Sequence, residues 1–273
     1  MPSSVLASPS NPRIKSIARL RDHRERESTG LTLVDGAREA RRALDAGVDV
    51  VEAFVCEPLL AGEDARAVLD ALRGHQVPII ATTEQAFAKI AFGDRAEGVV
   101  VVVRAPTRSL DDLTLPDEPL LIVVEGVEKP GNIGAILRSA DGAGADAVIA
   151  ASPRTDLTNP NAIRASAGTI FAVPTAAAAT SHVIGWLREH RIRSIAARVD
   201  AEQPYTEADL TGPLAIVLGT ETQGLTDAWR AADVEAVRLP MHGVADSLNV
   251  SVAAAVLLYE ARRQRDRHPE RRD

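Results

Sequence analysis

Three segments in the second half of the chain combine residue types that can bind and orient a polar ligand. The first covers residues 124–140 (VEGVEKPGNIGAILRSA), where an apolar run ends in a Gly/Pro turn and a helical pattern begins near Asn132. Arg138 lies off the apolar face of that helix and can project toward the carboxyl ends of the strands, where open α/β sheets bind ligands. Taken alone, this segment is explained more simply by a helix cap at Asn132 and a surface charge at Arg138.

The glycines of this segment do not form a nucleotide-binding fingerprint. Gly126, Gly131 and Gly134 give neither G-x-G-x-x-G nor the phosphate-loop pattern that ends in Gly-Lys-Ser/Thr. A nicotinamide-dependent enzyme is therefore a distant alternative.

The second segment covers residues 216–225 (IVLGTETQGL) and predicts a buried strand that runs into a turn. Gly219 allows a ligand to approach the backbone closely, and Gly224 can begin the next helix. Glu221 stands at the strand end as a candidate orienting or proton-handling group. An ordinary junction between strand, turn and helix would have the same composition.

The third segment covers residues 239–260, a loop rich in turn formers followed by a helix that is apolar on nearly every side. We expect Ser247 or Asp246 to cap this helix and Asn249 to lie in its first turn, where free N–H groups can hold a polar ligand. An apolar helix of this kind must be buried all round, and a partner subunit is one way to bury it.

Alternating short strands and helices surround these segments and predict two α/β domains. In the first half we expect strands at residues 31–34, 53–56, 78–81 and 99–103, with helices at 37–46, 64–73 and 83–91. In the second half we expect strands at residues 120–124, 147–150, 194–197, 214–218 and 234–239. Prolines at 106, 116 and 119 indicate a linker, which gives domains at residues 1–105 and 119–273 joined by residues 106–118.

A basic helix is expected at residues 12–27, ahead of the first strand. A thin apolar stripe lies under a face that carries Arg13, Lys15, Arg19, Arg24 and Arg26. A solvated surface helix and an RNA-binding face both fit this pattern.

The composition narrows the classes of protein. The formal net charge of −7 argues against a protein that coats nucleic acid through a uniformly positive surface, although local basic patches remain available. One cysteine and six unpatterned histidines predict no metal site. The absence of a secretory signal and of a membrane-spanning run predicts a cytoplasmic protein.

Together and in this order, the three segments resemble the signature motifs of the SpoU/TrmH branch of the SPOUT methyltransferases. The likeness extends over residues 120–263, and the first domain resembles the ribosomal-protein-like substrate domain of the same family. It implies a SPOUT α/β domain whose C-terminal part threads a loop to form a deep trefoil knot, an exception to the rule that chains do not knot.

The resemblance also implies a cofactor, S-adenosylmethionine, held in a bent form by the loops of the knot. Motif matching assigns its binding to Leu218, Gly219, Leu239, Met241 and Leu248, with Ala197 as a weaker candidate. It assigns Asn132, Arg138, Glu221, Ser247 and Asn249 to the catalytic centre, with Arg138 the principal residue for methylation of a ribose 2′-hydroxyl.

The resemblance further implies a homodimer that packs through the knotted domain, in which Arg138 can act on the partner's cofactor pocket. The separate basic N-terminal domain favours 23S rRNA as the substrate, and the whole pattern is similar to actinomycete rRNA methyltransferases of the avilamycin- and thiostrepton-resistance type. A tRNA 2′-O-methyltransferase and a non-catalytic RNA-binding or ribosome-assembly factor are the alternatives.

Overall fold

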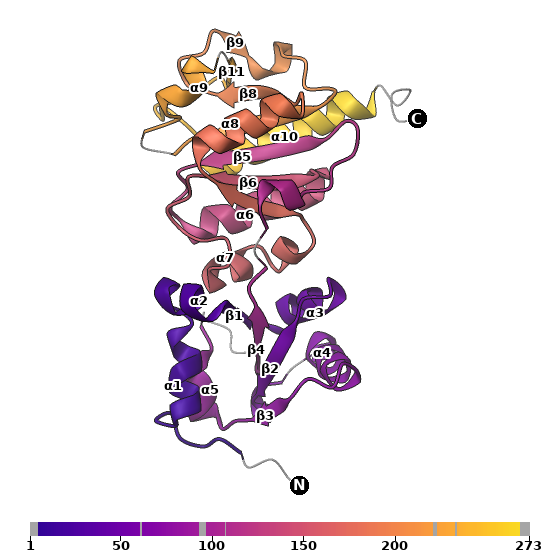
Figure 1. Cartoon of the computed structure of the whole chain (residues 1–273), viewed down its shortest axis with the longest axis vertical. Coiled ribbons are helices and arrows are strands. Elements are labelled where there is room, and N and C mark those ends of the chain that lie inside the picture. The colour runs from indigo at the N-terminus through magenta and orange to yellow at the C-terminus, as the bar shows by residue number, and fades with distance from the viewer. Residues whose placement is uncertain are drawn as a thin grey trace. The chain divides into compact units, whose positions relative to one another are not determined.

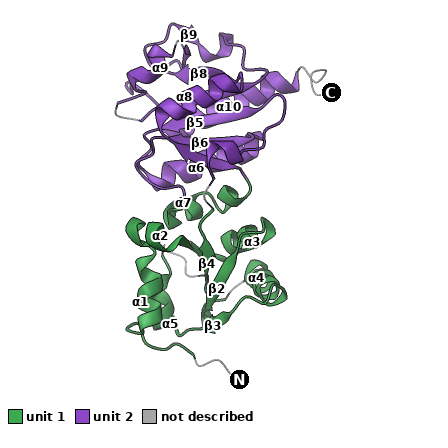
Figure 2. Cartoon of the chain, in the orientation of Figure 1, with its two compact units in different colours: residues 1–106, 158–172 green, residues 107–157, 173–273 purple. Residues whose placement is uncertain are grey.

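The chain folds into two compact units, shown in Figures 1 and 2. The computed structural model describes residues 5–60, 62–92, 97–106, 108–220, 223–232 and 234–267. Unit 1 comprises residues 1–106 and 158–172, and unit 2 comprises residues 107–157 and 173–273. Residues 158–172, which we expected in the second domain, therefore pack with the first.

Unit 1 contains a mixed sheet of four strands in the order β1-β4-β2-β3. β1 and β2 each pair antiparallel with β4, and β3 pairs parallel with β2. The strands are β1 (Leu31–Asp35), β2 (Val50–Val55), β3 (Ile79–Ala81) and β4 (Val99–Arg104). Buried valines fill β4, as the run of five consecutive valines predicts for a central strand.

Helices cover both faces of this sheet. One face buries apolar residues of α1 and α5, among them Ile14, Ile17, Phe87 and Ile90. The helices and turns of unit 1 are α1 (Pro12–Arg19), α2 (His23–Thr29), α3 (Ala37–Asp45), η1 (Glu57–Leu59), α4 (Gly62–Gly74), α5 (Glu84–Ile90), α7 (Pro160–Ala165) and η3 (Thr169–Phe171).

The single helix expected over residues 12–27 is wrong, because the chain breaks into α1 and α2. Asp22 caps the second helix by accepting a hydrogen bond from the backbone N–H of Arg24 at 2.8 Å. The Arg26 guanidinium then donates to the carbonyl oxygens of Leu20 and Arg21 at 2.9 and 2.7 Å, and so satisfies backbone acceptors at the break.

The segment 158–172 is held to unit 1 by polar contacts. The Thr32 hydroxyl donates to the Thr158 carbonyl at 2.7 Å, and Arg42 donates to the carbonyl of Ala167 at 2.7 Å. Arg164 lies 3.1 Å from the buried Asp35 carboxylate. These contacts explain why a segment that is distant in sequence belongs to this unit.

Unit 2 contains a parallel sheet of seven strands in the order β7-β6-β5-β10-β8-β11-β9. The strands are β5 (Leu120–Glu125), β6 (Ala147–Ala151), β7 (Thr175–Ala178), β8 (Arg193–Ala197), β9 (Gln203–Pro204), β10 (Leu214–Leu218) and β11 (Glu235–Arg238). The five strands expected here are all present, whereas β7 and β9 were not expected.

The helices of unit 2 are α6 (Pro130–Ala143), α8 (Thr180–Glu189), α9 (Asp227–Ala231) and α10 (Val250–Asp266), with short turns η2 (Leu110–Asp112) and η4 (Tyr205–Glu207). α6 packs against α10, and Arg262 of α10 donates to the carbonyls of Ala143 and Gly144 at 2.7 and 2.8 Å. This guanidinium satisfies acceptors at the C-terminus of α6.

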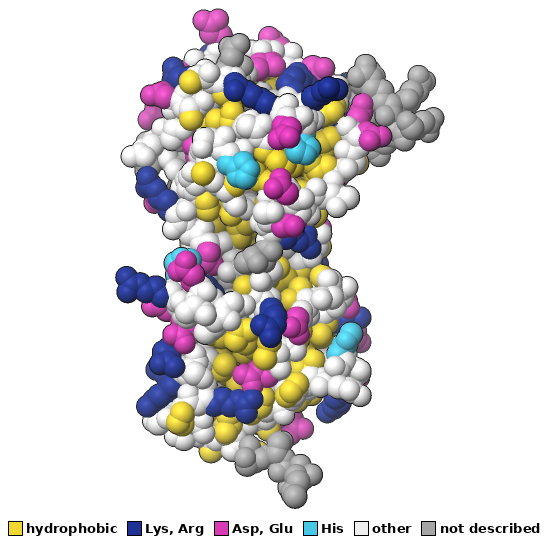
Figure 3. Space-filling model, viewed as in Figure 1, with side chains coloured by type: hydrophobic (Ala, Val, Ile, Leu, Met, Phe, Trp, Pro, Cys, Tyr) yellow, Lys and Arg dark blue, Asp and Glu magenta, His cyan; other side chains and the backbone are white. Residues whose placement is uncertain are grey.

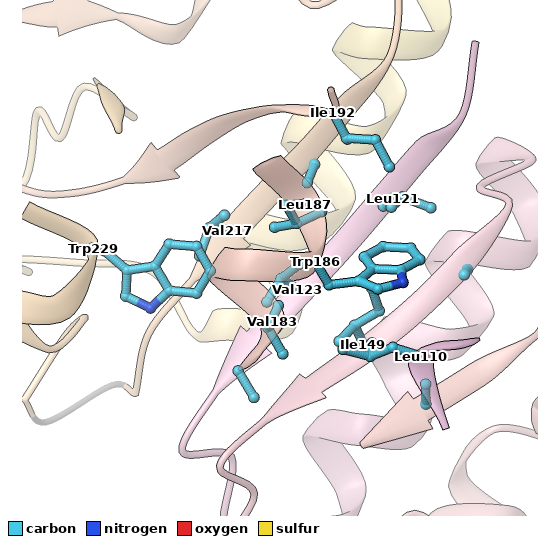
Figure 4. Close-up of a cluster of buried hydrophobic side chains, with 14 residues drawn as sticks. Leu110, Leu121, Val123, Ile149, Val183, Trp186, Leu187, Ile192, Val217 and Trp229 are labelled. Carbon is cyan, nitrogen blue, oxygen red and sulfur yellow. The ribbon is translucent and has the colours of Figure 1, made fainter. Parts of the chain in front are cut away.

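A hydrophobic cluster fills one face of the unit 2 sheet (Figure 4). Trp186, Val123 and Ile149 belong to it, and so does Leu110 from the segment expected to be a linker. Ser109 and Asp112 form a capping box around η2. Part of the expected linker is therefore packed structure.

The knot expected from the resemblance stays a prediction.

Within the described residues, no helix is long and apolar enough to cross a membrane. The same residues contain no group of three or more His, Cys, Asp or Glu side chains placed to hold a metal ion.

Candidate functional site

A cavity of about 480 Å³ opens at the carboxyl ends of β8 and β10 in unit 2. This is the edge at which parallel α/β sheets bind ligands. All six residues expected to hold a cofactor line it: Leu218, Gly219, Leu239, Met241, Leu248 and Ala197. Ser247, expected in the catalytic centre, lines the same cavity.

The turn after β10 folds tightly against this cavity. Thr220 and Gly224 exchange backbone hydrogen bonds of 3.1 and 3.0 Å, and the Gln223 N–H donates to the Thr220 hydroxyl at 3.0 Å. A Cβ atom on Gly219 would lie 2.1 Å from the carbonyl carbon of Gly224. Only glycine fits at position 219, and its backbone stays open to the cavity.

Apolar and polar residues share the walls of the cavity, and three of its four described charged lining residues form one cluster, with Asp246 as the fourth. Arg198 donates two hydrogen bonds to Asp200, at 2.9 and 2.8 Å, and Arg230 donates a third at 2.8 Å. The hydrogen bonds from Arg198 hold the pKa of Asp200 below its ordinary value. None of these three lining residues was predicted from the sequence, and Arg230 is brought to the strand end by a separate helix, α9.

Asn132 and Asn249 come together from two helices that pack against each other. Asn249 is the N-cap of α10, and its Oδ1 accepts a 2.9 Å hydrogen bond from the Ser251 N–H. Its Nδ2 donates to Asn132 Oδ1 at 3.3 Å. The expected cap at Ser247 or Asp246 is therefore wrong, because α10 begins at Val250. Asn132 lies in the first turn of α6, which Lys129 precedes as N-cap.

Arg138 does not join this group within one chain. Its side chain is exposed on α6, and it lines neither the large cavity nor the adjacent cavity of about 70 Å³ that Asn132 lines. Among the described residues, no hydrogen bond or ion pair involves Arg138. Glu221, the fifth expected catalytic residue, lies outside the described residues.

Four of the five basic residues expected to contact RNA are exposed on α1 and α2: Arg13, Lys15, Arg19 and Arg24. Arg13 pairs with Glu52, and Arg19 lies 3.8 Å from Glu25. On the face drawn in Figure 3, basic side chains along the edge of unit 1 alternate with acidic ones. Arg26 is only 3% exposed, so its assignment to an RNA-facing surface is wrong.

Similarity to known proteins covers almost the whole chain. The curated 23S rRNA (uridine(2479)-2′-O)-methyltransferase of Streptomyces viridochromogenes is 31% identical over 257 residues, which is 91% of this chain and 88% of that protein. A crystal structure of an RNA 2′-O ribose methyltransferase is 43% identical, with a TM-score of 0.86, and the alignment covers 96% of this chain and 99% of that chain.

A second solved structure, the SpoU methyltransferase AviRb from Streptomyces viridochromogenes in complex with AdoMet, is 30% identical with a TM-score of 0.84. The alignment covers 94% of this chain and all of that one. Residues 11–101 match the MRM3-like substrate binding domain, and residues 119–259 match the model of the SpoU rRNA Methylase family. This chain therefore belongs to the SpoU rRNA Methylase family.

Proposed function

We propose that this protein transfers a methyl group from S-adenosylmethionine to the 2′-hydroxyl of a specific ribose in 23S rRNA. The observation that carries the proposal is the single cavity that gathers all six residues matched to the cofactor motifs, at the strand ends of a SpoU family domain. The 23S rRNA substrate follows the relative from Streptomyces viridochromogenes, to which the chain is similar over both units.

The residues present fit this cofactor. A volume of about 480 Å³ suits a ligand of this size, since small-molecule sites span roughly 300–1,000 Å³. Leu239, Met241 and Leu248 offer apolar cover for an adenine ring, and the bare backbone at Gly219 allows close approach and hydrogen bonding. When bound, S-adenosylmethionine supplies an electrophilic methyl group on a sulfonium.

Polar residues of this chain would bind and activate the methyl acceptor, the ribose 2′-hydroxyl. A ribose hydroxyl is a poor nucleophile, so it must be held in line with the methyl group and relieved of its proton. The Asn132–Asn249 pair lies beside the cavity and can hold the ribose. In this proposal Arg138 would stabilise the developing negative charge on the 2′-oxygen, and Glu221, the proton-handling candidate, would accept the hydroxyl proton. Ser247, which lines the cavity, would help to hold the ribose.

A homodimer brings Arg138 to the reaction. Arg138 lines no cavity of its own chain among those described, so a second copy that packs against α6 and α10 would supply it. Val252 and Tyr259 of α10 are 47% and 54% exposed, one heptad apart on one face of the helix. Their burial in a dimer would satisfy the expectation that this apolar helix is covered.

Transfer of tritiated methyl groups from S-adenosylmethionine to unmethylated 23S rRNA and to tRNA tests the proposal. Label in 23S rRNA supports it, and an rRNA substrate would place the enzyme in the cytoplasm. Label in tRNA alone would replace the substrate. Cofactor-independent RNA binding without label would favour a non-catalytic ribosome-assembly factor. Growth of a bacterium that expresses the protein, in ribosome-targeting antibiotics, separately tests a role in resistance.

A further inference from the structure

Glu125 is a buried carboxylate at the end of β5 that has no part in the chemistry described above. It is 4% exposed, and its two oxygens accept three hydrogen bonds from neutral donors. Oε2 accepts from the backbone N–H of Thr226 at 2.8 Å, and Oε1 accepts from the hydroxyls of Thr226 and Thr180 at 2.8 and 2.7 Å. A buried carboxylate with this many donors is costly to disturb.

Two of these bonds hold the turn that shapes the large cavity. Thr226 directly follows Leu225, which lines that cavity, and the Thr220–Gly224 hydrogen bonds close the turn at its other side. Thr226 is the N-cap residue of α9, yet its side chain does not cap that helix. Its hydroxyl donates to Glu125 instead of accepting a hydrogen bond from a backbone N–H in the first turn of α9, which is the usual role of an N-cap threonine.

The third bond ties Glu125 to the scaffold away from that cavity. Thr180 begins α8, and its N–H donates to the Ser152 hydroxyl at 3.0 Å at the end of β6. Neither Thr180 nor Ser152 lines the cavity. The Glu125 carboxylate therefore links two parts of unit 2. Thr180 connects it to the start of α8 at the edge of the sheet, and Thr226 connects it to the turn that lines the large cavity.

We propose that Glu125 is a positioning residue for cofactor binding: it fixes Leu225 and Thr226 so that the cavity is preformed. The proposal rests on the proposed function, in which S-adenosylmethionine occupies this cavity. Pre-organisation matters because a turn that must be ordered on binding lowers the affinity. Glu125 also lines the small cavity, together with Thr220 of the same turn.

The two threonines provide a matched pair of variants. Thr226→Val and Thr180→Val each remove one hydroxyl that donates to the same oxygen, Glu125 Oε1, and keep nearly the same side-chain shape. We expect Thr226→Val to weaken binding of S-adenosylhomocysteine about tenfold or more, because one hydrogen bond to a charged group is lost. We expect Thr180→Val to lower the Tm by about as much as Thr226→Val does. We expect it to leave the dissociation constant for S-adenosylhomocysteine within about twofold of the wild-type value. Calorimetric titration and thermal unfolding measure the two quantities.

Glu125→Gln tests the carboxylate itself. Its amide nitrogen would face donors, so we expect the KM for S-adenosylmethionine to rise about tenfold or more while kcat at saturating cofactor stays within about threefold. Equal effects of the two threonine variants on affinity, or a loss of kcat without a change in KM, would overturn the positioning role. A wild-type protein that binds no S-adenosylhomocysteine would instead refute the proposed function, so the two failures are distinguishable.

Discussion

Asn249 donates a hydrogen bond to Asn132 with one amide atom and caps α10 with the other. The Nδ2 to Oδ1 distance to Asn132 is 3.3 Å, and Oδ1 of Asn249 accepts from the backbone N–H and the hydroxyl of Ser251 at 2.9 and 2.6 Å. Because capping requires the oxygen at the helix end, the NH₂ group must point toward Asn132. The start of α10 therefore orients a polar pair beside the cavity.

Asn249→Asp separates these two roles. Aspartate caps helices as well as asparagine does, but it cannot donate to Asn132. We expect Asn249→Asp to keep the Tm close to that of the wild type and to lower kcat at least tenfold. Asn249→Ala should lose both functions, with a destabilisation of about 1 kcal/mol from the missing cap. An Asn249→Asp enzyme with full activity would show that the amide pair has no role in catalysis.

Gly219→Ala should abolish cofactor binding through steric exclusion. The added Cβ would fall 2.1 Å from the Gly224 carbonyl carbon, so the turn must shift away from the cavity. We expect affinity for S-adenosylhomocysteine to fall more than tenfold in calorimetric titration. Gly185→Ala in α8 is the control, because its Cβ meets nothing within 4 Å and alanine favours a helix. Comparable losses of affinity in both variants would contradict the cavity assignment.

Arg138→Ala should inactivate the enzyme while leaving cofactor binding intact, since Arg138 does not line its own cavity. If the partner supplies this arginine, a mixed dimer of one Arg138→Ala chain and one Gly219→Ala chain contains one intact site. In that site the cavity belongs to the Arg138→Ala chain, and Arg138 comes from the Gly219→Ala chain. We expect such mixtures to recover part of the wild-type activity, although each variant alone is inactive. A mixture that forms heterodimers and stays inactive would show that Arg138 acts within its own chain.

Asp35 in unit 1 should make stability depend on pH. Burial raises the pKa of the Asp35 carboxyl to about 6, although the Phe92 N–H and Arg164 oppose the rise, and Glu97 and Glu39 add to it. A native pKa above the unfolded value means that the native state holds the proton more tightly. The stabilising contribution is full below pH 4 and is lost as the pH rises through 6.

We expect Asp35→Asn to be more stable than the wild type at pH 7.5 by up to about 3 kcal/mol, the equivalent of raising a pKa from 3.8 to about 6. The difference should shrink toward pH 4 in denaturant titrations. Asp70→Asn, on the exposed face of α4, serves as the control. A variant that is less stable than the wild type at pH 7.5 would show that the Arg164 pair outweighs burial.

The basic residues of α1 and α2 should divide into structural and RNA-binding groups. Arg26→Ala removes the guanidinium that donates to the Leu20 and Arg21 carbonyls, so we expect a loss of about 3 kcal/mol in stability. Lys15→Ala with Arg24→Ala should leave stability unchanged and weaken rRNA binding, with a salt-dependence slope lower by about 1 to 2. An unchanged slope would remove α1 and α2 from the RNA interface.

The two α/β folds could be predicted from the sequence for a physical reason, whereas the family and the residues matched to the cofactor motifs came from the resemblance of the three segments. Apolar strand runs such as residues 120–124 and 214–218 allow few alternatives, and motif residues that follow adjacent parallel strands must meet at one edge. The Ala-rich strand β7 was missed because alanine has little preference for strands, so only its neighbour β6 determines it.

Long-range contacts explain what could not be predicted. The break between α1 and α2 is stabilised by hydrogen bonds from the Arg26 guanidinium to the carbonyl oxygens of Leu20 and Arg21. The spacing of basic residues in the sequence cannot distinguish this buried arginine from an exposed one. Likewise, residues 158–172 pack in unit 1 through contacts such as Thr32 to Thr158, which no local pattern reveals. Ser247 and Asn249 are both good caps, and only the start of α10 decides between them.

The most direct test of the central claim is to map the modified nucleotide after reaction with S-adenosylmethionine and unmethylated 23S rRNA. Mass spectrometry of nuclease fragments should find a gain of one methyl group on a single ribose with the wild-type enzyme, and none with Arg138→Ala at equal cofactor occupancy. A methyl group on a base, or the same ribose modified by Arg138→Ala at the wild-type rate, would contradict the account.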